Sequence, residues 1–425
     1  MPFSDNRSFK ANPRMMASAK GCHYYDETGR SILDATAGLW CVNAGHARKP
    51  IVDAIRQQAE TLDFSPTFQL AHPLIFELSN RLLDFFPDPI NRFFFGNSGS
   101  EAVDSALKIA FAYHHATGET ARTRLIGRMR GYHGVGFGGI SVGGLENNRR
   151  AFPLLANVDH LSATFNLEEA AFSRGQPAWG VHLADELEAK IAQYGAHSIA
   201  AVIIEPLSGS AGVLVPPVGY LERIRAITKQ HGILLIFDEV ITAFGRLGAA
   251  TAAERFGVIP DMIVTAKGIT NGSVPMGCVG ASQFIYDQIL ESANAGIEFF
   301  HGYTYTGHPL AAAAALATLQ VYEDEALFTR SRDLEAYFED AVHSLADFPH
   351  VIDVRNLGLV AGIELAPRDG APGRRAMDLF RACFDSGLLV RVTGDIIALS
   401  PPLIFTREMI DETVDRIGQL LKKLN

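Results

Sequence analysis

Two apolar stretches in the middle of the chain each end in a single charged residue, and this pair constrains the fold more than any other feature. The stretch 233–237 runs into Asp238, and the stretch 262–266 runs into Lys267. Continuous rather than alternating hydrophobicity is typical of parallel strands that are buried on both faces. The carboxyl ends of such strands meet at the edge where open α/β sheets bind ligands. The sequence therefore predicts a carboxylate and an amine side by side at a ligand-binding edge.

This pair of groups suits pyridoxal phosphate (PLP), which needs a lysine for a Schiff base and a carboxylate beside the pyridine nitrogen. The carboxylate keeps that nitrogen protonated, so the ring can draw electrons from a substrate carbanion. Val240 lies two residues beyond Asp238 on the same predicted strand. Its side chain would therefore face the same side and pack on the ring. Each charged residue alone also has an ordinary interpretation, Asp238 as a helix cap and Lys267 as a solvated strand end.

A third segment offers a site for the phosphate. The strand-like run 93–95 breaks at small residues, and Ser98 with Glu101 forms the pattern of a capping box. Helical spacing follows in the apolar residues Ala102, Val103, Ala106, Leu107 and Ala110. The start of this helix would present free N–H groups and hydroxyls at its positive end, which suits a phosphate. An ordinary capped helix also explains the segment, and only its combination with Asp238 and Lys267 favours PLP.

The segment Gly131–Gly134 follows a strand-like run at 124–127. It would place the ring of Tyr132 against the pyridine, on the face opposite Val240. The glycines that continue to Gly139 also raise the possibility of a dinucleotide site. We exclude that site because no helical pattern follows them and basic residues stand where an acidic ribose ligand is needed.

Around these residues, nine motifs follow one another along the chain. They are Asp34–His46, Asn97–Glu101, Gly131–Gly134, Ser173–Pro177, Ile204–Pro206, Phe237–Val240, Thr265–Gly268, Thr304–Pro309 and Leu389–Pro402. The set resembles the class III aminotransferases of PLP fold type I. The first, fourth and last motifs resemble in particular the ω-amino acid:pyruvate (β-alanine:pyruvate) aminotransferases. The resemblance covers nearly the whole chain in order.

This resemblance implies a role for each matching cofactor residue. Lys267 is the Schiff-base lysine and proton carrier, and Asp238 is the partner of the pyridine nitrogen. Tyr132 and Val240 enclose the ring. The other cofactor-binding residues implied are Ser98, Gly99 and Ser100 at the phosphate, and His133 and Glu205 near the ring.

Two of these expectations go further. Glu205 either supports the cofactor or is a buried structural carboxylate. Thr304 matches a threonine that reaches the phosphate of the neighbouring subunit in the family, which implies a homodimer or homotetramer with shared active sites.

The expected substrate-binding residues are Arg391, Tyr132, Leu39, Trp40 and Phe64. Arg391 is the one arginine in an apolar stretch, and its guanidinium can hold a carboxylate in two parallel bonds. A surface ion pair is the ordinary alternative for Arg391, and core packing is the alternative for Leu39, Trp40 and Phe64.

One position separates this chain from relatives that use 2-oxoglutarate. Those relatives have a glutamate that pairs with the active-site arginine, whereas this chain has Ser210 at that position. Arg391 is therefore expected to lack that counter-ion, which favours pyruvate as the amino acceptor.

The expected fold is α/β, of PLP fold type I, the type of aspartate aminotransferase. A large domain with a mostly parallel sheet flanked by helices would be joined by a smaller α+β domain, because 425 residues exceed the usual limit for one core. We expect an N-terminal segment at 1–50 that packs with the small domain and the active site. The large PLP-binding domain would span 51–310, and the small domain would span 311–425.

Composition excludes several other classes of protein. A net charge of −10 without a basic stripe argues against nucleic acid as a partner, and no apolar run is long enough to cross a membrane. The N-terminus lacks the apolar core of a secretory signal, so we expect a cytoplasmic protein. The four cysteines show no paired spacing, and no metal site is predicted.

The expected activity is transfer of an amino group from a small-molecule amine donor to pyruvate. The donor would be an ω-amino acid such as β-alanine or an amine, and the products would be an aldehyde or keto compound and L-alanine. An aminomutase or racemase would share all the cofactor residues, and a 2-oxoglutarate-using ω-aminotransferase is a further alternative. The sequence does not rank the donors.

Overall fold

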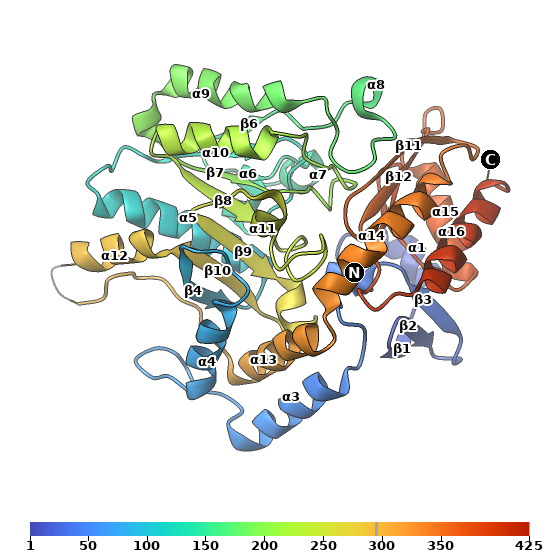
Figure 1. Cartoon of the computed structure of the whole chain (residues 1–425), viewed down its shortest axis with the longest axis horizontal. Helices are drawn as coiled ribbons and strands as arrows, with labels where there is room; N and C mark the ends of the chain where they lie inside the picture. Colours follow the sequence, from blue (N-terminus) through green and yellow to red (C-terminus); the bar gives the residue numbers. More distant parts are fainter. Residues whose placement is uncertain (294–295, 425) are drawn as a thin grey trace.

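The central element is a seven-stranded sheet with the strand order β4-β10-β9-β8-β7-β5-β6 (Figure 1). The computed structural model describes residues 1–293 and 296–424. The strands are β4 (Ile90–Gly96), β5 (Arg124–Arg128), β6 (Val158–Leu161), β7 (Ile199–Ile204), β8 (Leu234–Asp238), β9 (Met262–Ala266) and β10 (Gly277–Ser282). Strands β5 to β9 pair in parallel, whereas β10 is antiparallel to both of its neighbours. The predicted mostly parallel sheet is confirmed.

Helices cover both faces of this sheet. The longer helices of this part are α3 (Lys49–Thr61), α4 (Pro73–Leu82), α5 (Gly99–Ala116), α9 (Glu186–Tyr194), α10 (Tyr220–Gln230), α12 (Gln283–Ser292) and α13 (Pro309–Asp324). The alanine-rich α13 packs on α3 and α4 and against the short turn that follows β9. The sheet edge that carries Lys267 is therefore supported from one side by α13.

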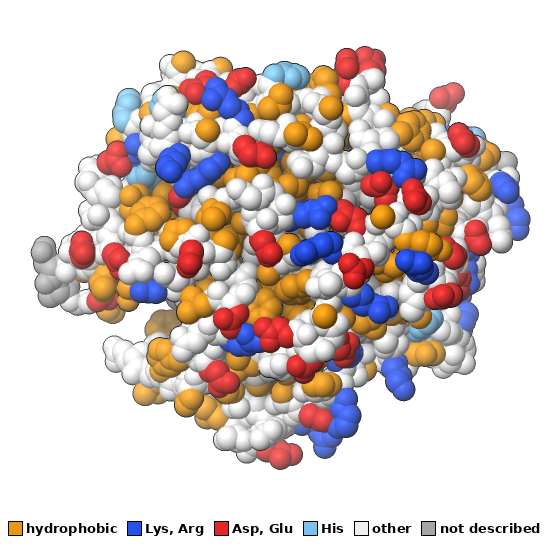
Figure 2. Space-filling view, viewed as in Figure 1, with side chains coloured by type: hydrophobic (Ala, Val, Ile, Leu, Met, Phe, Trp, Pro, Cys, Tyr) orange, Lys and Arg blue, Asp and Glu red, His pale blue; other side chains and the backbone are white. Residues whose placement is uncertain are grey.

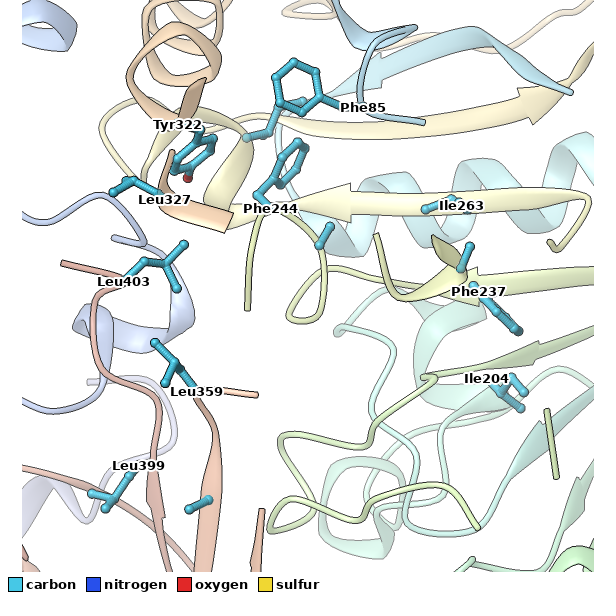
Figure 3. Packing of buried hydrophobic residues seen from close by; sticks show 14 of the residues in the cluster. Phe85, Ile204, Phe237, Phe244, Ile263, Tyr322, Leu327, Leu359, Leu399 and Leu403 are labelled. Atoms are coloured by element: carbon cyan, nitrogen blue, oxygen red, sulfur yellow. The ribbon is translucent and has the colours of Figure 1, made fainter. Parts of the chain in front are cut away.

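The two-sided cover explains why the strands are apolar throughout. Leu234 and Ile236 of β8 pack in a cluster with α5, whereas Phe237 lies in the cluster on the other face with α10. Figure 3 shows Phe237 beside Ile204 of β7 and Ile263 of β9. Burial of such side chains contributes about 1.5–3 kcal/mol each. Asp238 continues the series of Leu234 and Ile236, so its side chain falls on the face that carries α5.

The C-terminal part is a smaller α+β unit beside the central sheet (Figure 1). Its antiparallel sheet has the order β11 (Val351–Asn356), β12 (Ala361–Leu365), β15 (Ile396–Leu399), β14 (Arg391–Thr393). Its helices are α14 (Leu327–His343), α15 (Arg374–Asp385) and α16 (Arg407–Leu421). This matches the α+β part that the sequence predicted.

The N-terminal strands join this unit rather than the central sheet. They form a third sheet of β1 (Met16–Lys20), β2 (His23–Asp26), β3 (Ser31–Asp34) and β13 (Leu388–Leu389), in which β3 pairs in parallel with β13. The domain division itself stays a prediction. Its two boundaries fall in the first turns of α3 and α13, which begin at Lys49 and Pro309.

Two local expectations were wrong. The strand that was expected to continue to Val240 ends at Asp238, because Asp238 Oδ1 accepts the Val240 N–H at 3.1 Å and turns the chain. A short helix, α6 (Phe137–Val142), also lies within the glycine run where no helix was expected. It is held by a tertiary contact, since Gly139 N–H donates to Asp104 Oδ1 of α5 at 2.9 Å. Such a contact leaves no periodic signal in the sequence.

Charged side chains of both signs are interspersed over the face shown in Figure 2. Within the described residues, no helix is both long enough and apolar enough to cross a membrane.

Candidate active site

Asp238 and Lys267 lie at the same edge of the central sheet, as the sequence predicted. Strands β8 and β9 pair in parallel with Asp238 opposite Val264, and Lys267 follows the last residue of β9. Lys267 has a φ of 51° and opens a tight turn. A left-handed conformation costs a residue with a side chain about 1–2 kcal/mol, and such strain gathers at functional sites.

The amine of Lys267 is held without a partner. The side chain is half-buried, and none of the hydrogen bonds or ion pairs in the described chain involves its Nζ. Burial lowers the pKa of this amine, and the charge of Arg391 lowers it further against the opposing charges of Asp238 and Glu205. A lysine with a lowered pKa is a better nucleophile and proton acceptor near neutral pH.

Asp238 is fixed by two hydrogen bonds that leave its carboxylate at the strand end. Only 5% of its surface is exposed. His133 Nδ1 lies 2.8 Å from Asp238 Oδ2, and Val240 N–H donates to Oδ1. Because a carboxylate only accepts, Nδ1 is the protonated nitrogen of this buried imidazole. His133 therefore orients the carboxylate, while its own Nε2 has no partner in the described chain.

The start of α5 presents unpaired N–H groups next to these residues. Ser98 Oγ accepts the Glu101 N–H at 3.2 Å, which confirms half of the predicted capping box. The Glu101 carboxylate accepts the N–H of Asn97 at 2.7 Å, one residue before the cap. The backbone N–H groups of Gly99 and Ser100 donate to no acceptor in the described part of the chain. They form an anion site of the kind found at helix N-termini.

Val240 lies against the start of this helix. A Cβ placed on Gly99 would lie 3.1 and 3.2 Å from the two methyl groups of Val240. The helix start, the Val240 side chain and the end of β8 thus belong to one site.

The loop that carries Tyr132 also packs on α5. Val135 N–H donates to Ser100 Oγ at 3.0 Å. Gly134 has a φ of 85°, and a Cβ on it would lie 2.4 Å from Ser100 Oγ and 2.7 Å from the Cα of that residue. Only glycine permits this approach.

Glu205 anchors the same loop from the end of β7. It is 4% exposed, and its Oε2 accepts the Tyr132 N–H at 2.9 Å. Burial raises the pKa of this carboxyl to about 7. Arg128 Nη2 donates to the Glu205 carbonyl at 2.7 Å and to Ser208 Oγ at 2.8 Å. Glu205 is thus a buried carboxylate that positions the backbone of Tyr132, and its role toward the cofactor stays a prediction.

Arg391 carries an unpaired positive charge at the start of β14. It is half-buried, its Nε is buried without a partner, and no carboxylate in the described chain forms an ion pair with it. Burial lowers the pKa of its guanidinium. Thr393 Oγ1 donates to the Ser210 carbonyl at 3.1 Å, so β14 lies beside the segment that holds Ser210. The lack of a counter-ion from the position of Ser210 stays a prediction.

The remaining expected residues differ in their surroundings. Trp40 is 2% exposed and packs in a buried apolar cluster, whereas Leu39 is 51% exposed, and their assignment to the substrate site stays a prediction. Phe64 is 38% exposed, and its ring centroid lies 5.8 Å from that of Tyr305. Thr304 is exposed beside Tyr305, and no contact among the described residues brings it to Lys267.

Two residues near the site were not identified from the sequence. Cys41 lies close to the turn that begins at Lys267: Gly272 N–H donates to the Lys267 carbonyl at 3.0 Å, and a Cβ on Gly272 would lie 3.0 Å from the Cβ of Cys41. Asp34 is fully buried at the end of β3. An Asp-x-Thr pattern at Asp34 and Thr36 was the available signal, since such side chains bond to the backbone two residues on.

Comparison with known proteins decides the family. The model of the class-III aminotransferase family matches residues 5–421. The chain is 59% identical to an omega-aminotransferase of Caulobacter vibrioides, covering 100% of this chain and 97% of the relative. It is 47% identical to a beta-alanine–pyruvate aminotransferase of Pseudomonas aeruginosa, covering 99% and 94%. The chain belongs to the class III aminotransferases.

Solved structures of omega transaminases have the same fold as this chain. The omega transaminase of Pseudomonas jessenii in complex with PMP superposes with a TM-score of 0.94 at 32% identity, over 100% of this chain and 95% of that one. An (S)-enantioselective omega-transaminase of Thermomicrobium roseum gives 0.93 at 35% identity, over 100% and 96%. The fold is PLP fold type I, as the sequence predicted.

Class III aminotransferases use PLP, and the groups at this site fit that cofactor. A phosphate needs donors, and the start of α5 supplies two unpaired N–H groups. A pyridine nitrogen needs an oriented carboxylate, which Asp238 provides, and a carbonyl carbon needs an unpaired amine, which Lys267 provides.

The approach of Gly134 to Ser100 gives a test of this packing. Gly134→Ala and Gly118→Ala both place a side chain on a left-handed residue, at a cost of about 1–2 kcal/mol. Gly118 has a φ of 81° with nothing within 4 Å of its added Cβ, so it isolates that cost. Gly134→Ala should lose about 1–3 kcal/mol more through the steric clash.

Thermal unfolding of the two variants measures the difference. The Gly134→Ala midpoint should fall clearly below that of Gly118→Ala. Equal midpoints would show that the loop does not depend on close approach to α5.

Proposed function

We propose that this enzyme transfers an amino group from an ω-amino acid or amine to pyruvate, giving an aldehyde or keto product and L-alanine. The observation that carries the proposal is the guanidinium of Arg391, which forms no ion pair among the described residues, at the start of a strand that contacts the Ser210 segment through Thr393. An arginine free of a counter-ion can bind the carboxylate of a small keto acid in a bidentate manner. The names of the Caulobacter and Pseudomonas relatives support the same activity.

The chain would hold the cofactor at three points. Asp238, oriented by His133, would face the pyridine nitrogen, and Val240 and Tyr132 would pack on the two faces of the ring. The phosphate would be bound by Ser98, Gly99 and Ser100. When bound, PLP supplies an electron sink that stabilises the carbanion formed at the donor carbon.

Lys267 would be the catalytic base. Its Nζ has a lowered pKa and no competing partner, so the neutral amine is available to take the proton from the donor carbon. Glu205 would act as a positioning residue through Tyr132, whose backbone N–H it binds. Arg391 would hold the carboxylate of pyruvate and then that of alanine.

Two alternatives share the cofactor groups. An aminomutase or racemase would need no keto acid as a second substrate. A 2-oxoglutarate-using enzyme would have a carboxylate paired with Arg391, and none pairs with it among the described residues. Both alternatives are separated from the proposal by the dependence on pyruvate.

The function is tested with a panel of donors. Alanine formation from pyruvate is measured with β-alanine, 4-aminobutyrate, a longer ω-amino acid and an aromatic amine, with 2-oxoglutarate as the alternative acceptor. Alanine should form with at least one donor and should exceed glutamate formation. Turnover of a donor without any keto acid, or a preference for 2-oxoglutarate, would refute the proposal.

Arg391→Ala tests the carboxylate site. Loss of a desolvated charged partner costs about 2–5 kcal/mol, so the KM for pyruvate should rise by about 30-fold or more. A simple aldehyde acceptor uses the same cofactor groups but no carboxylate contact, and its KM should change far less. Equal losses for both acceptors would indicate general damage to the site and would remove Arg391 from this role.

We also propose a homodimer, or a tetramer built from such dimers, on the basis of an exposed apolar patch. The patch consists of Phe64, Phe68, Leu70, Phe300 and Tyr305, of which Phe300 is 87% exposed. Its two segments lie together, because Thr67 Oγ1 donates to the Thr306 carbonyl at 3.1 Å. Exposed apolar patches mark interaction sites, and Thr304 lies within this one.

Sedimentation measures the assembly directly. The parent should sediment as a dimer or larger, and Phe68→Asp should shift it toward the monomer with loss of activity. Val218→Asp, at a similarly exposed apolar position outside the patch, is the control and should leave the mass unchanged. A monomeric parent with full activity would refute an active site shared between subunits.

A further inference from the structure

Asp34 is a buried carboxylate that no step of the proposed reaction uses. It ends β3 and is fully buried. Oδ1 accepts the N–H of Thr36 at 3.0 Å and its hydroxyl at 2.9 Å. Oδ2 accepts the N–H of Gly38 at 2.6 Å and lies 2.8 Å from His46 Nε2. Each of the two carboxylate oxygens of Asp34 therefore has two hydrogen-bond partners within the chain.

The backbone that Asp34 binds is strained. Ala37 has a φ of 46°, Gly38 of 70° and Trp40 of 64°. Residues with side chains rarely adopt these values, and they persist only where surrounding contacts hold them. The bonds from Asp34 reach the residues on both sides of Ala37. Asp34 is thus the main polar anchor of the turn 35–41.

This turn forms part of the wall beside Lys267. It directs Leu39 outward, with 51% of its surface exposed, and buries Trp40. It then places Cys41 against the residues that follow Lys267, since a Cβ on Gly272 would lie 3.0 Å from the Cβ of Cys41. A shift of the turn would therefore move Leu39 and Trp40 relative to Lys267.

We propose that Asp34 is a positioning residue that sets the size of the donor-binding pocket through this turn. The proposal rests on the proposed function and on the expectation from the sequence that Leu39 and Trp40 belong to the substrate site, in which Leu39 is exposed and Trp40 lies in the buried cluster. It extends the proposed function by assigning to Asp34 the selection between two classes of donor, small ω-amino acids and bulky aromatic amines. His46, whose ring packs at a tilt on Tyr24 with ring centroids 4.3 Å apart, is the second member of the anchor.

Both oxygens of Asp34 are needed. An asparagine offers one accepting oxygen and one donating amide. The amide would meet either the N–H and hydroxyl of Thr36 or the N–H of Gly38 and the ring of His46. In either orientation one buried backbone N–H, that of Thr36 or that of Gly38, would lack an acceptor, which favours release of the strained turn.

Asp26 provides a matched control. It shows the same local pattern at the turn between β2 and β3, where Oδ1 accepts the Thr28 N–H at 2.9 Å and the Thr28 hydroxyl at 2.7 Å. That turn carries none of the residues assigned to the pocket. Asp26→Asn therefore makes the same chemical change without reaching Leu39 or Trp40.

The first measurement compares kcat/KM for a bulky aromatic amine with kcat/KM for β-alanine, both with pyruvate. In Asp34→Asn the ratio should rise by at least tenfold, because the released turn enlarges the pocket. In Asp26→Asn it should stay within twofold of the parent. If Asp34→Asn does not fold, His46→Leu removes one of the four contacts and should raise the ratio in the same direction.

The second measurement does not depend on activity. The chain has two tryptophans, Trp40 and Trp179, so a Trp179→Phe background leaves Trp40 as the only one. Asp34→Asn in this background should shift the emission to longer wavelength and increase quenching by acrylamide, because buried Trp40 becomes exposed. Asp26→Asn should leave the emission unchanged.

These results separate the possible outcomes. Equal losses for both donors with an unchanged ratio would show a purely structural role and overturn the proposal, as would unchanged Trp40 emission in folded Asp34→Asn. A parent that forms no alanine from either donor would refute the proposed function instead. In that case the Trp40 emission alone decides whether Asp34 holds the turn.

Discussion

The parallel pairing of β8 with β9 is the constraint on which the site depends. It brings Asp238 and Lys267 to one edge of the sheet, where burial lowers the pKa of the lysine amine. Neither residue is neutralised by the other. His133 holds the carboxylate, and the amine is left without a partner in the described chain. The unpaired amine lowers the local stability of the fold, but it leaves a carboxylate and an amine available for a ligand.

The surrounding loops are positioned by close backbone contacts with α5. Gly134 meets Ser100, and Val240 packs against Gly99. These contacts place the Tyr132 loop and the turn after β8 against the start of this helix. The unpaired N–H groups, the apolar side chain and the carboxylate therefore converge because one helix begins at that point.

Much of this arrangement could be predicted from the sequence. Buried strands ending in Asp238 and Lys267 give a strong signal, since continuous apolar runs are characteristic of a sheet covered on both faces. Features that depend on tertiary contacts could not be predicted. The early end of β8 depends on a side-chain bond to Val240, and α6 depends on a bond from Gly139 to Asp104. The anchoring of the turn 35–41 by Asp34 likewise required the positions of its partners in space.

The central claim is that Lys267 is the residue that binds the cofactor covalently. Reduction of the PLP-loaded enzyme with borohydride, followed by proteolysis and mass spectrometry, tests it most directly. We predict one pyridoxyl group per chain, on the peptide that contains Lys267, and none when Lys267 is replaced by Ala. A stoichiometric label on another lysine, with Lys267 unmodified, would contradict the account.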